Sequence, residues 1–441
     1  MQTRFDNTLS QLLHTVPECS GLAVALSGGL DSMALLELAR NYAIKVNMPL
    51  CAIHIHHGLS ANADAWLAFT QQACAARGIA FYSQRVRLSN ATRKGIEAKA
   101  REARYQAIDA QAPKGYAILL GQHKDDQVET FFLRLKRGAG VKGLGAMQAV
   151  SHGHNRVLIR PLLDFSRNEL AQFVDANGLT HIHDESNDDN KFDRNFLRND
   201  VLPLLNERFH GFNDKVAQAA NLLQSQQSLL DEFALADLQS AQQGEERLCT
   251  DTLVALGPSR CINALRYWLA VHHYLMPSQA KLAEFLQQLT VARDDSQPEI
   301  VIKSQDGHKG YLRRYNAHLY LVGPEPKIID QLIDIKEPSI VLSDGRTILL
   351  CAGEGIRLPN ETESVTVKFG QLSAKIRPQS KPYSNKLSHW LKELRVPPWQ
   401  RQQIPLIFYN ETLVAVVGYF YNHDFLASQG LQWQIKTPSP M

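Results

Sequence analysis

The sequence predicts an α/β fold in which helices cover both faces of a parallel sheet, followed by a helical domain and a small α+β C-terminal domain. Two observations favour the sheet. Short apolar or β-branched runs alternate with helical segments through the first half of the chain, which is the pattern of successive βαβ units. The first of these runs also leads directly into a serine- and glycine-rich turn and then a helix, and ligands bind parallel sheets at this edge.

The elements follow in order along the chain. The expected strands are 22–26, 50–56, 81–88 and 116–121, and the helices between them are 32–42, 61–77 and 96–110. A capping box at Ser166 and Glu169 predicts a further helix that ends near Asn177. We expect a catalytic domain over 1–213, a helical domain over 214–335 and a basic C-terminal domain over 336–441.

Composition sets outer limits on function. A chain of 441 residues with 44% hydrophobic and 21% charged residues is typical of a globular protein of two or three domains. The first residues lack the apolar stretch of a signal peptide, and no run reaches the length of a membrane span, so we expect a cytoplasmic protein without a membrane partner. The six cysteines are scattered without a CxxC pair, which argues against disulfides and structural zinc.

The turn after the first strand has the features of a phosphate-binding loop. Its residues are Ser27, Gly28, Gly29, Leu30, Asp31 and Ser32. Glycines let the backbone approach an anion, and the amides of the following helix point toward it. No lysine follows the glycines, which excludes the usual loop for γ-phosphoryl transfer. An acid beside a polyphosphate requires a hard cation between them, so Asp31 is a predicted Mg²⁺ ligand and the cut is expected at the α-phosphorus. The alternative is a glycine-rich turn without a ligand.

Two further motifs end strands of the same sheet. Residues 54–59 close the second strand with three histidines, and residues 121–130 follow the fourth strand. Asp126 and Glu129 are three residues apart in the helix that begins there, so both carboxylates lie on one face. The alternative is that acids at a helix N-terminus only complement its dipole, which would suffice for Asp125 or Asp126 alone.

Several segments resemble one known family. They are VALSGGLDSM, HHGL, AKAREARY, GQHKDDQVETFFLRLKRGAGVKGLGAM, RPLL with RNEL, and DRNFLRNDVLPLL, and together they cover most of residues 20–210. The phosphate loop is similar to that of the ATP pyrophosphatase (PP-loop) family, which has an adenine nucleotide α-hydrolase-like fold. The complete set resembles its tRNA(Ile)-lysidine synthetase branch. HWLKELRVPPWQRQQIPLIF is similar to the C-terminal domain of the long bacterial members.

The resemblance implies a ligase that uses ATP and Mg²⁺. Such enzymes activate the C2 carbonyl oxygen of the wobble cytidine in an isoleucine tRNA with a CAU anticodon, and an amine of free L-lysine then displaces AMP to form lysidine. It implies that Ser27, Gly28, Gly29 and Ser32 hold the β and γ phosphates and that Asp31 holds the metal. The implied catalytic residues are Asp31, His123, Asp126 and Glu129.

The lysine substrate requires charges of both signs. Asp126 and Glu129 would take its amines, and either Arg101 or Arg104 would take its carboxylate, with a solvated helix face as the alternative for the two arginines. His123 would orient the carbonyl oxygen or neutralise the adenylate. The alternative is a neutral histidine hydrogen-bonded to the backbone.

Basic residues indicate where tRNA would bind. Arg134 and Arg137 flank a glycine-rich stretch that either holds an RNA backbone or is an ordinary helix exit. Arg194 and Arg198 match the family pattern and would face the anticodon arm. Residues 366–401 contain eight basic residues against Glu393 alone, which predicts an RNA-binding patch that includes Lys381, Lys386, Arg395 and Arg401.

Three other functions remain open at this point. One is an ATP-dependent tRNA thiolase, which would need reactive or paired cysteines. Another is a small-molecule amide or guanidine synthetase, which would not need the basic patch. The third is a nonenzymatic ATP- or RNA-binding module, which would release no pyrophosphate. The sequence leaves open the oligomeric state, with a homodimer as one option, and the roles of His56 and His57. It also does not identify the residues that hold a base splayed from its loop.

Overall fold

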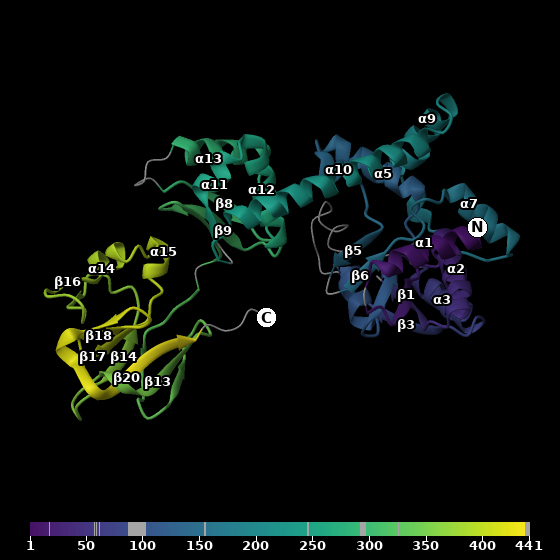
Figure 1. Cartoon of the computed structure of the whole chain (residues 1–441). Coiled ribbons are helices and arrows are strands. Elements are labelled where there is room, and N and C mark those ends of the chain that lie inside the picture. The colour runs from purple at the N-terminus through teal and green to yellow at the C-terminus, as the bar shows by residue number, and fades with distance from the viewer. Residues whose placement is uncertain are drawn as a thin grey trace. The chain divides into compact units, whose positions relative to one another are not determined.

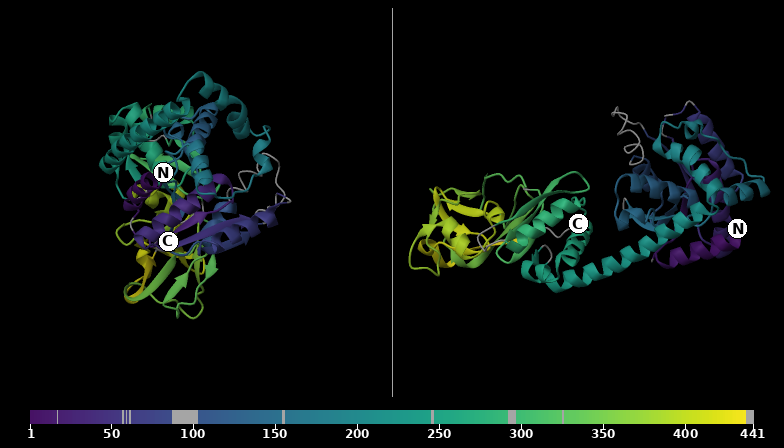
Figure 2. Two further views of the ribbon diagram at one scale, coloured as in Figure 1. Left: turned by 90° about the vertical axis from the view of Figure 1, so that its right-hand side faces the viewer. Right: turned by 90° about the horizontal axis from the view of Figure 1, so that it is seen from above.

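The computed structural model describes residues 1–16, 18–56, 58, 60, 62–86, 103–153, 156–244, 247–291, 297–324 and 326–436. The chain divides into two compact units, Met1–Glu232 and Phe233–Met441 (Figure 1). The boundary between them lies inside the helix α10 (Phe212–Ala241), which the right-hand view of Figure 2 shows as one continuous helix. The sequence instead predicts a first domain boundary at residue 213.

The first unit contains a six-stranded sheet in the order β3-β2-β1-β4-β6-β5. Its strands are β1 (Gly21–Ala25), β2 (Leu50–His56), β3 (Ala80–Arg85), β4 (Tyr116–Leu119), β5 (Val150–Gly153) and β6 (Arg156–Ile159). All neighbouring strands pair in parallel except β5, which is antiparallel to β6. The parallel α/β sheet predicted from the sequence is therefore confirmed.

Helices connect these strands. They are α1 (Gln2–His14), α2 (Leu30–Val46), α3 (Ala63–Ala75), α5 (Lys124–Lys136), α6 (Val141–Leu144), α7 (Arg167–Ala176), α8 (Asp193–Phe196) and α9 (Leu202–Arg208), with a 3₁₀ turn η1 (Glu185–Asp188) and a π-helical turn η2 (Leu197–Val201). Residues 103–111 are also helical, and the earlier part of the helix predicted at 96–110 lies outside the described residues. The predicted capping box begins α7: the Glu169 amide donates to Ser166 Oγ (3.2 Å), and the Ser166 amide donates to Glu169 Oε2 (2.7 Å).

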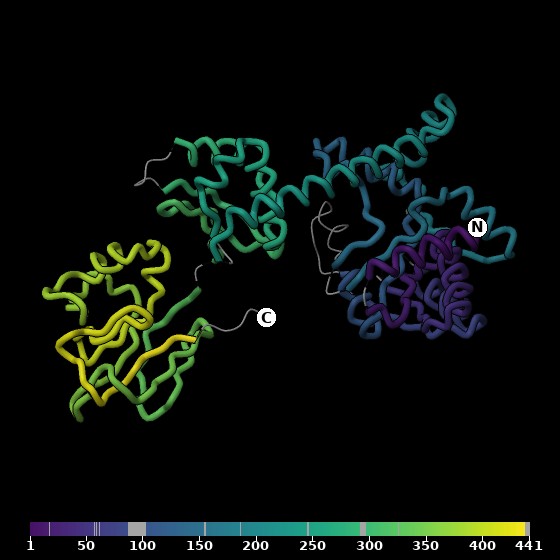
Figure 3. Tube along the Cα trace, viewed as in Figure 1, coloured from purple at the N-terminus to yellow at the C-terminus, as the bar shows by residue number. Residues whose placement is uncertain are grey.

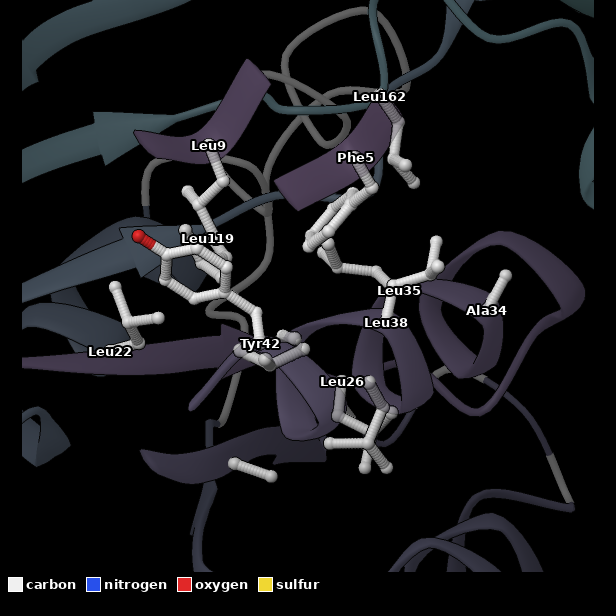
Figure 4. Packing of buried hydrophobic residues seen from close by; sticks show 14 of the residues in the cluster. Phe5, Leu9, Leu22, Leu26, Ala34, Leu35, Leu38, Tyr42, Leu119 and Leu162 are labelled. Atoms are coloured by element: carbon white, nitrogen blue, oxygen red, sulfur yellow. The ribbon is translucent and has the colours of Figure 1, made fainter. Parts of the chain in front are cut away.

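Helices cover both faces of the sheet. On one face, fully buried Phe5 of α1 and Leu35 of α2 belong to one apolar cluster with Leu22 and Leu119 of the strands (Figure 4). On the other face, a second cluster joins Ile108, in the helix of residues 103–111, to the strands. Each fully buried side chain of this size stabilises the fold by about 1.5–3 kcal/mol, so the layers hold the carboxyl ends of the strands at fixed positions.

The second unit begins with helices and a sheet. The helices are α11 (Thr250–Ala255), α12 (Pro258–Val271) and α13 (Gln279–Val291), and the antiparallel strands are β7 (Arg247–Cys249), β8 (Glu299–Lys303), β9 (Lys309–Tyr315) and β10 (His318–Val322). Trp268 is buried in their core. The expected helical region is present, but our sequence analysis missed its sheet, because charged residues on the exposed face interrupt the apolar runs of β8 and β9.

The rest of this unit consists mainly of strands. They are β11 (Gln331–Leu332), β12 (Ser339–Val341), β13 (Thr347–Ile356), β14 (Val365–Lys368), β15 (Lys375–Ile376), β16 (Asn385–Lys386), β17 (Leu406–Tyr409), β18 (Thr412–Val416), β19 (Phe420–Tyr421) and β20 (Leu426–Lys436), with the helices α14 (Leu387–Glu393), α15 (Pro398–Arg401) and a 3₁₀ turn η3 (His423–Phe425). Figure 3 traces this part from green to yellow. The predicted α+β character of the C-terminal domain is confirmed. Among the described helices, none is long and apolar enough to cross a membrane.

Candidate active site

The phosphate loop joins β1 to α2, and hydrogen bonds of Ser32 to the loop backbone hold its turn. Ser32 Oγ accepts a hydrogen bond from the Gly28 amide (3.0 Å) and donates to the Gly29 carbonyl (2.9 Å), which fixes the turn. Gly28 has a φ of 92°, and a Cβ there would lie 2.5 Å from Ile182 Cδ1, so this position requires glycine. No side chain caps the N-terminus of α2. Its first amides therefore point at a position suited to an anion.

Asp31 lies in the first turn of α2 and has the features of a metal ligand. One of its oxygens, Oδ1, is buried and has no hydrogen-bond partner, although the side chain as a whole is 34% exposed. A buried carboxylate oxygen without a partner is costly unless a cation or donor completes it. Among the described residues no three His, Cys, Asp or Glu side chains form a metal cluster, so oxygen ligands from a bound polyphosphate would have to complete the shell.

His123, the residue before α5, connects the phosphate loop to the carboxylates of α5. Its Nε2 lies 3.6 Å from Asp31 Oδ1 and 3.5 Å from Asp126 Oδ2, and its ring is only 1% exposed. Burial by itself lowers the pKa of the imidazole, but the surrounding carboxylates, Asp125 and Asp31 foremost, raise it to about 10. His123 is therefore an imidazolium at neutral pH. The three carboxylates against the ring favour this charged form over the alternative of a neutral, backbone-bonded histidine.

Asp126 and Glu129 lie side by side on α5 and are paired with two arginines. Arg194 binds Glu129 Oε2 through Nε (2.5 Å) and Asp126 Oδ1 through NH2 (2.7 Å). Arg198 binds Glu129 Oε1 through Nε (2.6 Å) and Asp126 Oδ1 through NH2 (3.0 Å). Glu129 is fully buried. The predicted juxtaposition of the two acids is present, but both already have counter-ions.

The pairing determines the charge of this cluster. Burial alone would raise the pKa of the Asp126 carboxyl, but His123 and the two guanidinium groups together hold it below its usual value. Desolvation likewise opposes the charge on Arg194, and the facing acids raise its pKa above the ordinary value. Asp126 and the two arginines are therefore charged at neutral pH, and both acids are occupied by guanidinium groups that a substrate amine would have to displace.

Three family models and many relatives identify the chain. The model of a PP-loop domain matches residues 1–205, that of a TilS substrate binding domain matches 248–320, and that of a TilS substrate C-terminal domain matches 365–437. A tRNA(Ile)-lysidine synthase from Enterobacter sp. (strain 638) is 38% identical over 431 residues, which cover 97% of this chain and 100% of that protein. One from Vibrio vulnificus (strain CMCP6) is 38% identical over 412 residues, covering 92% and 93%.

The chain belongs to the tRNA(Ile)-lysidine synthase family. It therefore has an ATP-utilising PP-loop domain, and the ligase class inferred from the motifs is confirmed.

Asp125 has different partners from Asp126 and Glu129 in α5. Its carboxylate accepts hydrogen bonds from the Arg167 amide (2.8 Å) and Asn213 Nδ2 (2.8 Å), and its pKa falls to about 2 although burial opposes the shift. Asp125 therefore fastens α5 to α7 and α10.

The sequence analysis assigns the lysine carboxylate to Arg101 or Arg104. Arg101 is outside the described residues, and Arg104 is exposed on the helix of residues 103–111. The guanidinium groups that do reach the α5 acids belong to Arg194 and Arg198, which we had expected to face the anticodon arm. Their four-residue spacing on a helical segment was the available signal, because it places both side chains on one face.

Arg134 and Arg137 follow on the last turns of α5. Arg134 NH1 donates to the carbonyls of Gly143 (2.8 Å) and Ala146 (2.6 Å), so this guanidinium orders the glycine-rich stretch from within. Gly138 ends the helix with a φ of 68°, as expected for a helix exit. Arg137 is exposed. Of the two, only Arg137 presents its charge to solvent without these carbonyl contacts.

The basic patch of the C-terminal domain is partly neutralised. Lys381 pairs with Glu393, while Arg377 and Lys368 pair with Asp424 and Glu411, acids that lie beyond the basic window in sequence. The guanidinium of Arg401 donates to the Val396 carbonyl (2.8 Å) and the Tyr315 hydroxyl (3.1 Å). Lys386 and Arg395 are exposed. These last two therefore offer the most accessible charge among the four predicted tRNA contacts.

The two described histidines of β2 have structural contacts. His54 Nδ1 lies 2.9 Å from the Leu26 carbonyl, so its ring has a backbone partner within the sheet. His56 is the last residue of β2, is 8% exposed and lies 3.2 Å from Asp64. His57 lies outside the described residues.

Proposed function

We propose that this chain ligates free lysine to C2 of the wobble cytidine in an isoleucine tRNA with a CAU anticodon, with ATP as the activating substrate. One observation carries the proposal. The phosphate loop and the α5 acids meet at His123, whose ring lies 3.5 Å from Asp126 and 3.6 Å from Asp31. An activated α-phosphate and a lysine amine would thus be held close together, and such positioning provides much of the rate gain in a two-substrate reaction.

In the first step the cytidine C2 oxygen attacks the α-phosphorus and pyrophosphate leaves. The α2 amides and the hydroxyls of Ser27 and Ser32 would hold the departing phosphates. Mg²⁺ bound at Asp31 would supply charge neutralisation for the polyphosphate, which fits the unpartnered Oδ1 of that residue. The imidazolium of His123 would stabilise negative charge on the adenylate through its fixed position in a buried site.

In the second step a lysine amine attacks C2 and AMP leaves. Asp126 and Glu129 would bind the substrate's ammonium, and this requires exchange of counter-ions because Arg194 and Arg198 occupy both acids. A guanidinium released by the exchange is then available for the substrate's carboxylate. This exchange leaves no buried charge without a partner at any stage, which avoids a penalty of several kcal/mol.

The test is transfer of radiolabelled lysine, with ATP and Mg²⁺, into an unmodified isoleucine tRNA transcript with a CAU anticodon. A methionine tRNA with the same anticodon is the matched control. Label in the first tRNA alone is the expected result. Pyrophosphate release without label in either tRNA would instead mean that another nucleophile attacks.

Three buried thiols give no support for a sulfur-transfer reaction. Burial raises the pKa of Cys51, Cys74 and Cys261 to about 11, so these three are protonated at neutral pH. Protonated thiols are poor nucleophiles.

A further inference from the structure

The segment of residues 192–198 has two different faces. The helix α8 begins at Asp193 and continues into η2, and the Phe196 amide donates to the carbonyl of the extended N-cap residue Phe192 (3.0 Å). Arg194 and Arg198 extend from one face to the acids of α5. Each helical residue turns by about 100°, so side chains two positions away from Arg194 lie on nearly the opposite face. Those side chains are Phe192 and Phe196.

The two phenylalanines are unusually exposed for large apolar side chains. Phe192 is 50% exposed and Phe196 is 48% exposed. They are four residues apart and so lie on the same face of the turn. A single exposed apolar residue is ordinary, but two large aromatic side chains exposed on the segment that supplies the counter-ions of the α5 acids indicate a surface that meets a partner.

Exposed cations lie next to this aromatic pair in the sequence, together with neighbouring acids such as Asp189. Asp193, between the two rings in sequence, forms an ion pair with Lys136 of α5 (2.7 Å). Arg137 adjoins Lys136, Lys191 adjoins Phe192, and all three cations are exposed. Aromatic rings among cations suit single-stranded RNA, whose unstacked bases stack on the rings while its phosphates contact the cations. A protein partner would gain less from this arrangement of charge.

We propose that Phe192 and Phe196 form a stacking platform for unpaired anticodon-loop bases that flank the target base. This inference rests on the proposed function, which requires the target base to leave its loop and enter the site. The inner face of the same turn carries the arginines at the α5 acids, so a base held there would leave its neighbours at the outer face.

The direct test places a fluorophore on the platform. In a Phe196→Trp variant, a stem-loop RNA with a CAU loop should quench the added indole emission, measured against the wild-type protein, which has five tryptophans of its own. A fully paired RNA of equal length and charge should leave that emission unchanged. Equal quenching by both RNAs, or by neither, would overturn the platform.

Kinetics supply an independent readout. We expect Phe192→Ala/Phe196→Ala to raise the KM for tRNA roughly tenfold and to leave the KM values for lysine and ATP near those of the wild type, because stacking acts on RNA bases alone. Paired substitutions by tyrosine should retain tRNA binding, whereas paired leucines should not. Phe233→Ala is the matched control, since Phe233 is 59% exposed on α10. Full binding by the leucine variant would overturn stacking.

Two outcomes separate this inference from the proposed function. Selective quenching by the stem-loop, without lysine transfer by the wild-type chain, supports the platform and contradicts the proposed reaction. Lysine transfer without selective quenching supports the reaction and overturns the platform. Self-association of the wild type that the double alanine variant loses, measured by sedimentation, would assign the two rings to a protein contact and also overturn it.

Discussion

The phosphate loop and the α5 acids lie at the same sheet edge but are built in opposite ways. The loop comes from one short stretch, and it leaves the start of α2 uncapped and Asp31 Oδ1 without a partner. The acids receive their counter-ions from residues 65 or more positions away, and both acids are paired. The loop is thus prepared for ligands by incomplete pairing, whereas the acids must exchange a partner before a substrate amine binds.

The largest effect is expected at the phosphate loop, whose polar groups are incompletely paired. Asp31→Ala should lower pyrophosphate release by about 10³-fold, comparable to losing a central electrostatic group of an active site. Binding of tRNA, measured by filter retention, should stay within about twofold. Near-normal pyrophosphate release would remove the metal role. Asn41→Ala is a suitable control because Asn41 lies on the same helix, α2.

Substitution of the paired α5 acids should change the affinity of the protein for lysine. Asp126→Asn should raise the lysine KM and lower turnover, together by about 10²-fold in kcat/KM, since one acid of the pair loses its charge. ATP affinity should not change. Steady-state kinetics at varied lysine and saturating ATP measure this, and unchanged lysine constants would exclude Asp126 from the subsite.

Arginine substitutions compare the sequence-based and structure-based assignments of the lysine carboxylate site. Arg194→Ala should raise the lysine KM about tenfold or more, because a guanidinium at the acids is lost. Arg104→Ala, at an exposed position, should change it little. The reverse order of effects would restore the sequence-based assignment.

The charged His123 predicts how stability depends on pH. Its pKa is raised from 6.5 to about 10, so its stabilising contribution is complete below about pH 6.5 and is lost as the pH rises toward 10. Urea unfolding of the nucleotide-free chain should show this decline, and His123→Gln should flatten it. An equal decline in the variant would mean that other groups cause it.

The smallest effect is expected in the C-terminal domain. Replacing Lys386 and Arg395 by alanine should weaken tRNA binding a few-fold and reduce the slope of log Kd against log salt by about one per lost phosphate contact. Lys381→Ala should change the slope less, because Lys381 already pairs with Glu393. Equal slopes for all variants would mean that this patch faces away from the RNA.

Local patterns in the sequence were sufficient for features that neighbouring residues create. The β1 strand, the glycine turn and α2 follow from a continuous stretch, and Ser166 and Glu169 define the start of α7 within three residues. The same holds for the common face of Asp126 and Glu129, because helical geometry alone brings residues three apart together. These were predicted because each depends on backbone propensity and spacing.

Only the tertiary structure decided which charges meet. Arg194 and Arg198 come from a later segment, and nothing in their local pattern specifies that they pair with acids of α5 rather than face solvent. The charge of His123 likewise depends on Asp31 and Asp125 arriving from separate elements. Sequence determined the residue types and the order of elements, whereas packing of distant segments set the distances and burial on which ion pairs and pKa values depend.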